Sequence, residues 1–303
     1  MIKVLLTDTL SQKAVELLKE IPEFEIVVKS GMTPEQLRQE IKNYEAVVVR
    51  GMTRLDGETL EGAEHLRIIV NAGVGLDNID VEAAKSRHIE VRDTPSATAV
   101  TVAEYTLAQM LAICRYIGPA YQSMKAHKWE KKLFSDGMEL YGKTAGIIGM
   151  GRIGKEVAKR ELVMGMKVLY YDIVEVQTDM NARQVSLEEL LRSSDFISIH
   201  LPLTESTRNL ISVEAFEKMK DGVVFVNVAR GGVVDESALR EALETGKIKA
   251  VAIDVYEQEP LEDFSLIDQE RVFPAPHLGA STVEAQERAG LEAILILKEF
   301  FNA

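Results

Sequence analysis

Residues 144–160 read TAGIIGMGRIGKEVAKR, and this stretch opens with a short apolar run that ends at Gly149. Gly149, Gly151 and Gly154 have G-x-G-x-x-G spacing, and a helix-forming segment follows them. After a strand, such glycines allow a tight turn, the close approach of a phosphate to the backbone, and close packing of the next helix. The stretch therefore predicts a parallel α/β sheet with a dinucleotide bound at the amino end of a helix.

The next predicted strand, MKVLYYD, ends in Asp172. A carboxylate at this point can accept hydrogen bonds from both hydroxyls of an adenosine ribose, and it would repel a 2′-phosphate. Ile173 follows, where an arginine could have attracted that phosphate. We therefore expect NAD, and not NADP, as the cofactor.

Short β-branched runs alternate with helical stretches along the whole chain, which is typical of an α/β protein with parallel strands. The length of 303 residues predicts two domains of roughly 150 residues each. A long apolar helical stretch from Ala99 to about His127, interrupted near Gly118, separates two series of strands. A capping box from Ser281 to Glu284 opens the last helix. Strands are expected near residues 3–6, 25–28, 46–49, 68–70 and 89–91, and near 145–148, 168–171, 196–199, 223–228 and 250–253.

The charge balance of 35 Lys+Arg against 48 Asp+Glu gives a net charge of −13. This charge repels phosphate backbones and anionic lipid, so neither a nucleic acid nor a membrane is expected as a partner. The start, MIKVLLTDTL, lacks the pattern of a signal peptide. The single cysteine, Cys114, excludes an internal disulfide and fits a reducing compartment. We expect a cytoplasmic protein, and no metal, because the histidines lack ligand spacing.

Three polar residues follow predicted strands of the second series. Arg230 lies in NVARGGVVDE, Glu259 in AIDVYEQEP and His277 in PAPHLGAST. Because the carboxyl ends of parallel strands meet at one edge of a sheet, these side chains are expected near the dinucleotide. Taken singly, such an arginine is more often an ion-pair partner and such a histidine structural. Together they supply a cation for a carbonyl oxygen and a proton donor, which a dehydrogenase needs.

Five stretches, in order and spanning most of the chain, resemble the D-isomer-specific 2-hydroxyacid dehydrogenase family. They are NAGVGLDNID from Asn71, GIIGMGRIGKEVA from Gly146, NVARGGVVDESAL from Asn227, AIDVYEQEP from Ala252 and PHLGAST from Pro276. Within that family the chain is most similar to the members that oxidise D-3-phosphoglycerate. The resemblance implies an NAD-dependent enzyme that acts on a small anionic 2-hydroxy acid.

The resemblance also implies a role for each catalytic residue. His277 would be the general base when the hydroxy acid is oxidised and the general acid when the keto acid is reduced. Glu259 would bind the far ring nitrogen and raise the histidine's pKa. Arg230 would bind the substrate's carboxylate and its C2 oxygen.

The motif and the resemblance together predict the residues that contact the cofactor and the substrate. Cofactor contacts are expected at Gly149, Gly151, Arg152, Ile153, Gly154, Asp172, His200, Val228, Ala229, Arg230, Asp254, His277, Gly279 and Ala280. Substrate contacts are expected at Arg50, Val74, Gly75, Arg230 and His277, with the backbone amides of Val74 and Gly75 holding the carboxylate.

The domain arrangement implied by the resemblance is one α/β domain inserted into another. Residues 1–97 with 276–303 would form the substrate-binding domain, and residues 98–275 the NAD-binding domain. A homodimer is expected through the long helices. Because the chain stops after its last core helix, we expect no regulatory domain of the kind that longer family members carry.

The leading hypothesis is NAD-dependent oxidation of D-3-phosphoglycerate to 3-phosphooxypyruvate, the entry to serine biosynthesis. Asn71 leaves undecided whether the phosphate site is complete, because such relatives often carry an arginine there. One alternative is a glyoxylate or hydroxypyruvate reductase, or another D-2-hydroxyacid dehydrogenase. The other is an NAD-sensing binding protein without catalysis, which the complete set of Arg230, Glu259 and His277 disfavours.

Overall fold

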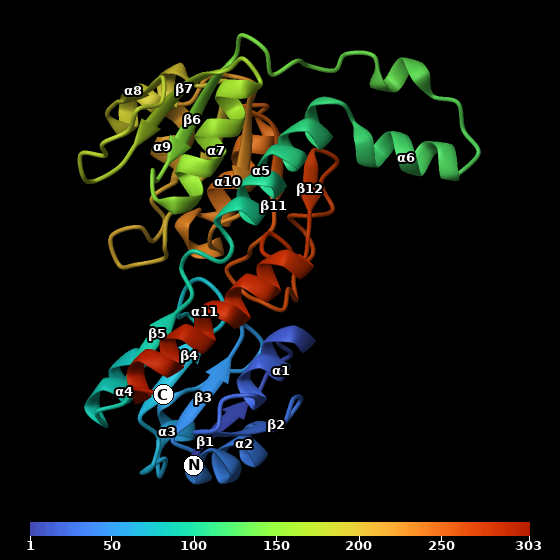
Figure 1. Ribbon diagram of the computed structural model, residues 1–303. Helices are drawn as coiled ribbons and strands as arrows, with labels where there is room; N and C mark the ends of the chain where they lie inside the picture. The colour runs from blue at the N-terminus through green and yellow to red at the C-terminus, as the bar shows by residue number, and fades with distance from the viewer. The chain divides into compact units, whose positions relative to one another are not determined.

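The computed structural model describes residues 1–303 and divides them into two compact units (Figure 1). The first unit consists of Met1–Ala99 and Ala280–Ala303, and the second of Val100–Gly279. Each unit contains one parallel sheet covered by helices. The expected fold class, two parallel-sheet α/β domains with one inserted into the other, is confirmed. No helix combines the length and the apolar character needed to cross a membrane.

The sheet of the first unit has five strands in the order β2-β1-β3-β4-β5. The chain therefore builds outward from β1 in both directions, and a crevice forms beyond the carboxyl ends of β1 and β3. Open α/β sheets bind ligands at such a point. The strands are β1 (Ile2–Leu6), β2 (Phe24–Val28), β3 (Ala46–Val49), β4 (Ile68–Asn71) and β5 (Glu90–Asp93). The helices are α1 (Gln12–Lys19), α2 (Pro34–Glu40), η1 (Ile41–Asn43), α3 (Gly57–Leu60), α4 (Val81–Ser86) and α11 (Val283–Phe301).

Helix α11 returns to the sheet with which the chain began. Its residues Ala293 and Leu297 are buried in the same cluster as Leu18 of α1 and alternate residues of β1, β3 and β4. Gly290 allows the two helices to approach, because a Cβ there would lie 2.4 Å from the Cβ of Ala14. Helices α2, α3 and α4 contribute to the core on the opposite face of the sheet.

The sheet of the second unit has seven strands in the order β12-β11-β10-β9-β6-β7-β8. The direction of building reverses between β6 and β9, so the crevice of this sheet lies beyond their carboxyl ends. The strands are β6 (Thr144–Ile148), β7 (Lys167–Tyr171), β8 (Ala182–Gln184), β9 (Phe196–Ile199), β10 (Val223–Asn227), β11 (Ile248–Ile253) and β12 (Val272–Pro274). The helices are α5 (Ala99–Cys114), α6 (Ile117–Lys125), η2 (Lys131–Phe134), α7 (Arg152–Val163), α8 (Leu187–Ser193), α9 (Val213–Lys218), η3 (Gly231–Val233) and α10 (Glu236–Glu244).

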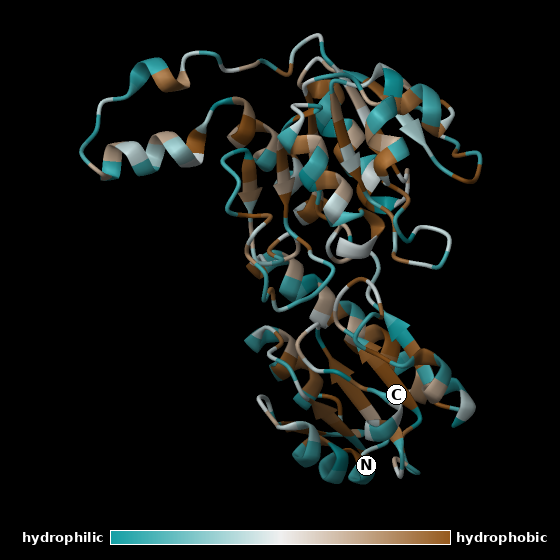
Figure 2. Ribbon diagram, turned by 180° about the vertical axis from the view of Figure 1, so that it is seen from behind, coloured by the Kyte–Doolittle hydropathy of each residue, from teal (hydrophilic) through white to brown (hydrophobic).

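The central strands β9 and β10 are buried along their whole length. A parallel strand covered by helices on both faces is apolar almost throughout, as these two are. Figure 2 shows the same pattern in each unit, with hydrophobic strands inside and hydrophilic turns on the outer helices.

Two details of the helices differ from the prediction. The long helical stretch breaks at Tyr116, whose φ of 51° is left-handed, and Gly118 lies in the first turn of α6. The capping box expected at Ser281 is wrong. Thr282 has extended backbone angles and is the cap, because its hydroxyl accepts the amide of Ala285 at 3.1 Å.

Helix α6 and the short helix η2 form an arm that stands away from the sheet of the second unit (Figure 1). Large apolar side chains are exposed along it, a pattern that marks interaction surfaces. They are Ile117, Tyr121, Met124, Trp129 and Leu133.

Candidate functional site

The glycine turn joins β6 to α7 at the crevice of the second sheet, and its three glycines have different surroundings. Gly149 has a left-handed φ of 98°. A Cβ on Gly154 would lie 2.1 Å from the carbonyl oxygen of Gly149, so the helix could not pack as it does. No atom lies within 4 Å of a Cβ placed on Gly151, which leaves open space beside the backbone.

The amino end of α7 is available to an anion. Gly151 is its N-cap and supplies no capping side chain, and both Gly151 and Arg152 are exposed. The first amides of a helix lack intrahelical partners and carry the positive end of its dipole. Asp172, after β7, lies at the same turn, since its Oδ2 accepts the amide of Met150 at 2.8 Å. Its Oδ1 accepts the amide of Val174 at 3.3 Å.

His200 follows β9 on the other side of the turn. A Cβ on Gly149 would lie 2.6 Å from the carbonyl oxygen of His200. Burial lowers the pKa of the imidazole to about 3, so the ring is neutral. Its Nε2 lies 3.0 Å from Oγ of Ser198, whereas Nδ1 is buried with no hydrogen-bond partner in the chain. The uncapped helix, the glycine cradle and this orphaned nitrogen fit a bound dinucleotide.

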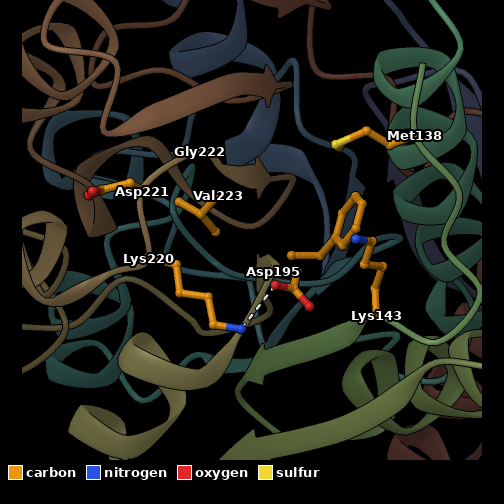
Figure 3. A pocket seen from close by; sticks show the side chains of 8 residues that line it. Met138, Lys143, Asp195, Lys220, Asp221, Gly222 and Val223 are labelled. Carbon is orange, nitrogen blue, oxygen red and sulfur yellow. Dashed lines mark hydrogen bonds and ion pairs between the residues drawn. The ribbon is translucent and has the colours of Figure 1, made fainter. Parts of the chain in front are cut away.

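A small pocket of the second unit lies at the opposite edge of the sheet. Its lining residues Lys143, Phe196 and Val223 place it at the amino ends of β6, β9 and β10. Figure 3 shows beside it the ion pair between Lys220 and Asp195 (Nζ to Oδ1, 2.9 Å). Its volume of ≈ 100 Å³ is too small for a dinucleotide. Because the glycine turn lies at the carboxyl end of β6, this pocket is separate from it.

Arg230 lies in the turn after β10, which Asn227 shapes. Asn227 donates from Nδ2 to the carbonyl of Arg230 at 3.1 Å and accepts the amide of Ala229 at 3.2 Å. Nη1 of Arg230 donates to the carbonyl of Ala229 at 2.7 Å. A Cβ on Gly231 would lie 2.0 Å from the carbonyl of Tyr256, so this turn packs directly on the segment after β11. The charge of Arg230 consequently acts on the two groups described next.

Glu259 and His277 form a pair in which Nδ1 of the imidazole lies 2.7 Å from Oε2 of the carboxylate. Oε1 of Glu259 accepts the amide of Tyr256 at 3.0 Å, which holds the carboxylate in place. The hydrogen bond to Glu259 raises the pKa of His277 despite partial burial and the repulsion of Arg230. Burial raises the pKa of Glu259, but its bonds to His277 and Tyr256 outweigh that effect and leave it lowered. The pair therefore favours a protonated imidazole beside a charged carboxylate.

Asp254, at the end of β11, holds the loop that carries His277. Its carbonyl accepts the amide of His277 at 2.9 Å, and its two carboxylate oxygens accept those of Leu278 and Gly279 at 2.7 Å each. His277 itself has a left-handed φ of 54°. These bonds explain why residues 276–279, grouped with the first domain at the sequence level, belong to the second unit.

Arg50 follows β3 in the first unit, at the crevice between β1 and β3. Asp8, after β1, holds this turn because its carboxylate accepts the amides of Arg50 and Thr53 and the hydroxyl of Thr53. The guanidinium of Arg50 is half-buried and makes no hydrogen bond to the chain. Burial lowers its pKa, and the charge of Asp8 opposes this. Arg50 is thus an ordered and partly desolvated cation.

The turn with Val74 and Gly75 also belongs to the first unit. Gly75 has a φ of 93°, and its carbonyl accepts Nδ2 of Asn71 at 2.6 Å. The amide of Gly75 donates to Oδ2 of Asp93 at 3.4 Å, which is a long hydrogen bond. Oδ1 of Asn71 is buried and has no hydrogen-bond partner.

The structure gathers the expected cofactor and catalytic residues at the carboxyl edge of the second sheet, except that Ala280 begins the return to the first unit. Val228 and Ala229 directly precede Arg230, and Ile153 lies in the first turn of α7. Sequence reasoning missed Asp8, although it directly follows the first predicted strand. It also missed Tyr105 of α5, whose hydroxyl donates to Asp254.

Comparison with known proteins identifies the chain's relatives. Residues 107–279 match the family described as D-isomer specific 2-hydroxyacid dehydrogenase, NAD binding domain. The hydroxypyruvate reductase of Thermotoga maritima is 46% identical over 96% of both chains. The D-3-phosphoglycerate dehydrogenase of Methanocaldococcus jannaschii is also 46% identical, over 96% of this chain and 56% of its own length. This chain thus spans little more than half of that relative.

A solved structure agrees with both. The D-lactate dehydrogenase of Aquifex aeolicus, crystallised with NAD and lactic acid, superposes with a TM-score of 0.85 at 30% identity. The match covers 99% of this chain and 95% of that one. The chain belongs to the D-isomer-specific 2-hydroxyacid dehydrogenase family, and it is an NAD-dependent oxidoreductase of small hydroxy acids.

Proposed function

We propose that the protein oxidises D-3-phosphoglycerate to 3-phosphooxypyruvate with NAD. The observation that carries this choice is Arg50, a half-buried guanidinium for which the chain supplies no hydrogen-bond acceptor, at the ligand crevice of its sheet. A partly desolvated, unpaired cation gains most from a doubly charged phosphate. This reaction would open serine biosynthesis. We place it in the cytoplasm, in keeping with the free thiol of Cys114.

The proton chemistry is assigned to the second unit. Nε2 of His277 takes the proton of the C2 hydroxyl during oxidation and returns it to the carbonyl oxygen during reduction. Glu259 stabilises the imidazolium formed when that proton arrives. Arg230 binds the substrate carboxylate and the C2 oxygen and stabilises the carbonyl dipole. When bound, NAD supplies the acceptor for the hydrogen and electron pair that leave C2.

The cofactor would be held by the glycine turn and its neighbours. The amides at Gly151, Arg152 and Ile153 would bind the pyrophosphate, and Asp172 the adenosine ribose. His200 would offer its orphaned Nδ1 to the cofactor. Further contacts are proposed at Gly149, Gly154, Val228, Ala229, Arg230, Asp254, His277, Gly279 and Ala280.

The first unit would supply the rest of the substrate site. Arg50 would bind the phosphate, and the amides of Val74 and Gly75 the carboxylate. In this proposal Met1–Ala99 with Ala280–Ala303 act as the substrate-binding domain and Val100–Gly279 as the NAD-binding domain.

A second candidate is the reduction of hydroxypyruvate or glyoxylate. Asn71, on the strand next to that of Arg50, is neutral, so a second cation is missing at this edge. The hydroxypyruvate reductase of Thermotoga maritima, which aligns over 96% of both chains, also favours it. Both candidates use the same proton and hydrogen chemistry and differ only in the group on C3.

The deciding experiment follows NADH absorbance with D-3-phosphoglycerate, D-glycerate and D-lactate plus NAD, and with hydroxypyruvate and glyoxylate plus NADH. We expect phosphoglycerate to have the highest kcat/KM among the three hydroxy acids. Arg50→Met should raise its KM at least tenfold, because a charge-assisted bond is lost. Exposed Arg54, as Arg54→Met, is the matched control. Turnover of hydroxypyruvate without any of phosphoglycerate would establish the second candidate instead.

We also propose that the protein is a homodimer formed through the segment from α5 to η2. The exposed apolar side chains of the arm support this, because a monomer gains nothing from presenting them to water. Light scattering after gel filtration should give twice the chain mass of 33.7 kDa. Trp129→Asp with Leu133→Asp should give the monomer mass. Leu295→Asp, on α11 of the first unit and equally exposed, should not.

A further inference from the structure

Asp254 is the meeting point of two elements of the second unit. From one side it receives the amides of Leu278 and Gly279, which follow His277. From the other side, Oδ1 accepts the hydroxyl of Tyr105 on α5 at 3.3 Å. Its side chain is only 1% exposed, so these protein donors take the place of water.

The hydrogen bonds at Tyr105 run in one direction. Nε2 of Gln109, one helical turn further along α5, donates to the phenol oxygen at 2.7 Å. The single phenol proton is therefore directed to Asp254, which as a carboxylate only accepts. Burial and the charge of Asp254 raise the pKa of Tyr105 to about 12, so the phenol keeps that proton at neutral pH.

The ring of Tyr105 also lies beside the loop. A Cβ on Gly279 would lie 3.8 Å from Cδ1 of Tyr105 and 4.0 Å from Cγ1 of Val102, one turn earlier. Helix α5 therefore lies against the loop after His277. The ring of Tyr105 is next to Gly279, and its hydroxyl is connected to the loop through Asp254.

We propose that Tyr105 is a positioning residue for His277, acting through the carboxylate of Asp254. The proposal rests on the proposed catalytic role of His277. The left-handed backbone of His277 is a strained conformation for a histidine, and such conformations persist only where the surroundings hold them. The phenol contributes by keeping Asp254 ionised and fixed, so that both oxygens remain acceptors for the loop.

The charged and titratable groups around the loop determine what the loss of the hydroxyl does. Asp254 is influenced by Tyr105 of α5, by Tyr256 of its own segment and by His277. His277 is influenced by Glu259, Arg230 and Asp254. A looser loop would weaken the bond from Glu259, which is the largest cause of the raised pKa of His277. The pKa of His277 should consequently fall when the hydroxyl is removed.

The test is Tyr105→Phe, which keeps the ring on Gly279 and removes only the hydroxyl. The imidazoles of protein labelled with ¹³C-histidine are titrated by NMR without substrate, and His277→Ala assigns the signal among the five histidines. We expect the pKa of His277 to fall by at least about 0.3 unit. Tyr44→Phe is the control, because Tyr44 of the first unit is a buried phenol bonded to Glu40 at 2.7 Å.

Kinetics with whichever hydroxy acid is turned over complete the test. We expect kcat to fall about tenfold, as for one hydrogen bond to a charged group, with KM and the NAD Kd within about twofold. An unchanged pKa of His277 overturns the proposal, whatever happens to kcat. If the pKa of His277 falls but kcat is unchanged, Tyr105 positions His277 as proposed, and the catalytic role of His277 is overturned. If Tyr105→Phe does not fold, Gln109→Leu removes the donor behind the phenol and should move the pKa in the same direction.

Discussion

Oε2 of Glu259 lies 2.7 Å from Nδ1 of His277, so Nε2 is the ring nitrogen that would exchange a proton with substrate in the proposed reaction. This hydrogen bond raises the pKa of His277 above its ordinary value of 6.5. Protonation is thereby favoured in the free enzyme, and the pH dependence of the two reaction directions follows.

Oxidation of the hydroxy acid requires a neutral imidazole, and reduction of the keto acid requires a protonated one. We expect kcat/KM for oxidation to rise with pH and level off only above the raised pKa of His277. For reduction, kcat/KM should instead fall as the pH rises through the same pKa. Profiles in both directions from pH 5 to 10 test this. A limb centred at or below 6.5 would contradict the role given to Glu259.

Glu259→Gln removes the charge behind His277 but keeps a side chain of the same size. The pKa of His277 should fall, and the limb of the oxidation profile should move to lower pH. We expect kcat to drop about 10- to 100-fold, the range for a hydrogen bond to a charged group. The neighbouring Glu257→Gln should leave both quantities unchanged. If Glu259→Gln and wild type have the same pH profile, the carboxylate of Glu259 has no part in the proton transfer.

The glycine turn offers a pair of alanine substitutions with different effects on stability. Gly154→Ala forces a Cβ to within 2.1 Å of the carbonyl of Gly149. It should lower the free energy of unfolding by about 1–3 kcal/mol and weaken NAD binding. Gly151→Ala meets no atom within 4 Å, so it should change stability by less than about 0.5 kcal/mol. It should still weaken NAD binding at least tenfold, because its methyl group occupies the space left for the pyrophosphate.

Calorimetry and thermal unfolding measure the two effects separately. A Gly151→Ala protein that binds NAD like wild type would show that the open space beside the turn is not used by the cofactor. A Gly154→Ala protein as stable as wild type would show that α7 can shift away from β6.

Glu161 of α7 predicts a pH-dependent stability unrelated to catalysis. Both carboxylate oxygens are buried without a hydrogen-bond partner, and burial raises the pKa to about 8 from 4.5. Between these values the folded state binds a proton that the unfolded state releases. Stability is therefore full below the unfolded pKa and decreases as the pH rises through the folded one.

Urea unfolding at pH 5.5 and pH 8 measures this dependence. Glu161→Leu should raise the free energy of unfolding at pH 8 by about 2 kcal/mol and have a smaller effect at pH 5.5. Glu188→Gln, at an exposed position on α8, is the control. Equal gains for Glu161→Leu at both pH values would mean that the carboxyl is not the titrating group.

Most of the fold could be predicted because the buried strands are short β-branched runs between helical segments. The strands missed were β8 and β12, which have three residues each and lie at the two edges of their sheet. An edge strand needs neither an apolar run nor a free amide at every position, so β12 can end in Pro274. The break at Tyr116 carries no glycine signal and depends on tertiary packing.

The residues of the candidate site were predicted from motifs, whereas their supports were not. Arg230, Glu259 and His277 each follow a strand in a recognisable stretch. Tyr105 and Gln109 are ordinary members of a largely apolar helix, and only the hydrogen bonds that lead to Asp254 give their polar atoms a function. Such contacts join residues far apart in the chain, which periodicity does not report.

The three bonds from Asp254 to residues 277–279 also have a mechanical consequence. The chain leaves the second unit directly after Gly279, so His277 lies two residues from the end of that unit. The carboxylate of Asp254 fastens the chain between that point and His277. A displacement of the chain after Gly279 would therefore load the hydrogen bonds of Asp254 before it reached the imidazole that lies against Glu259.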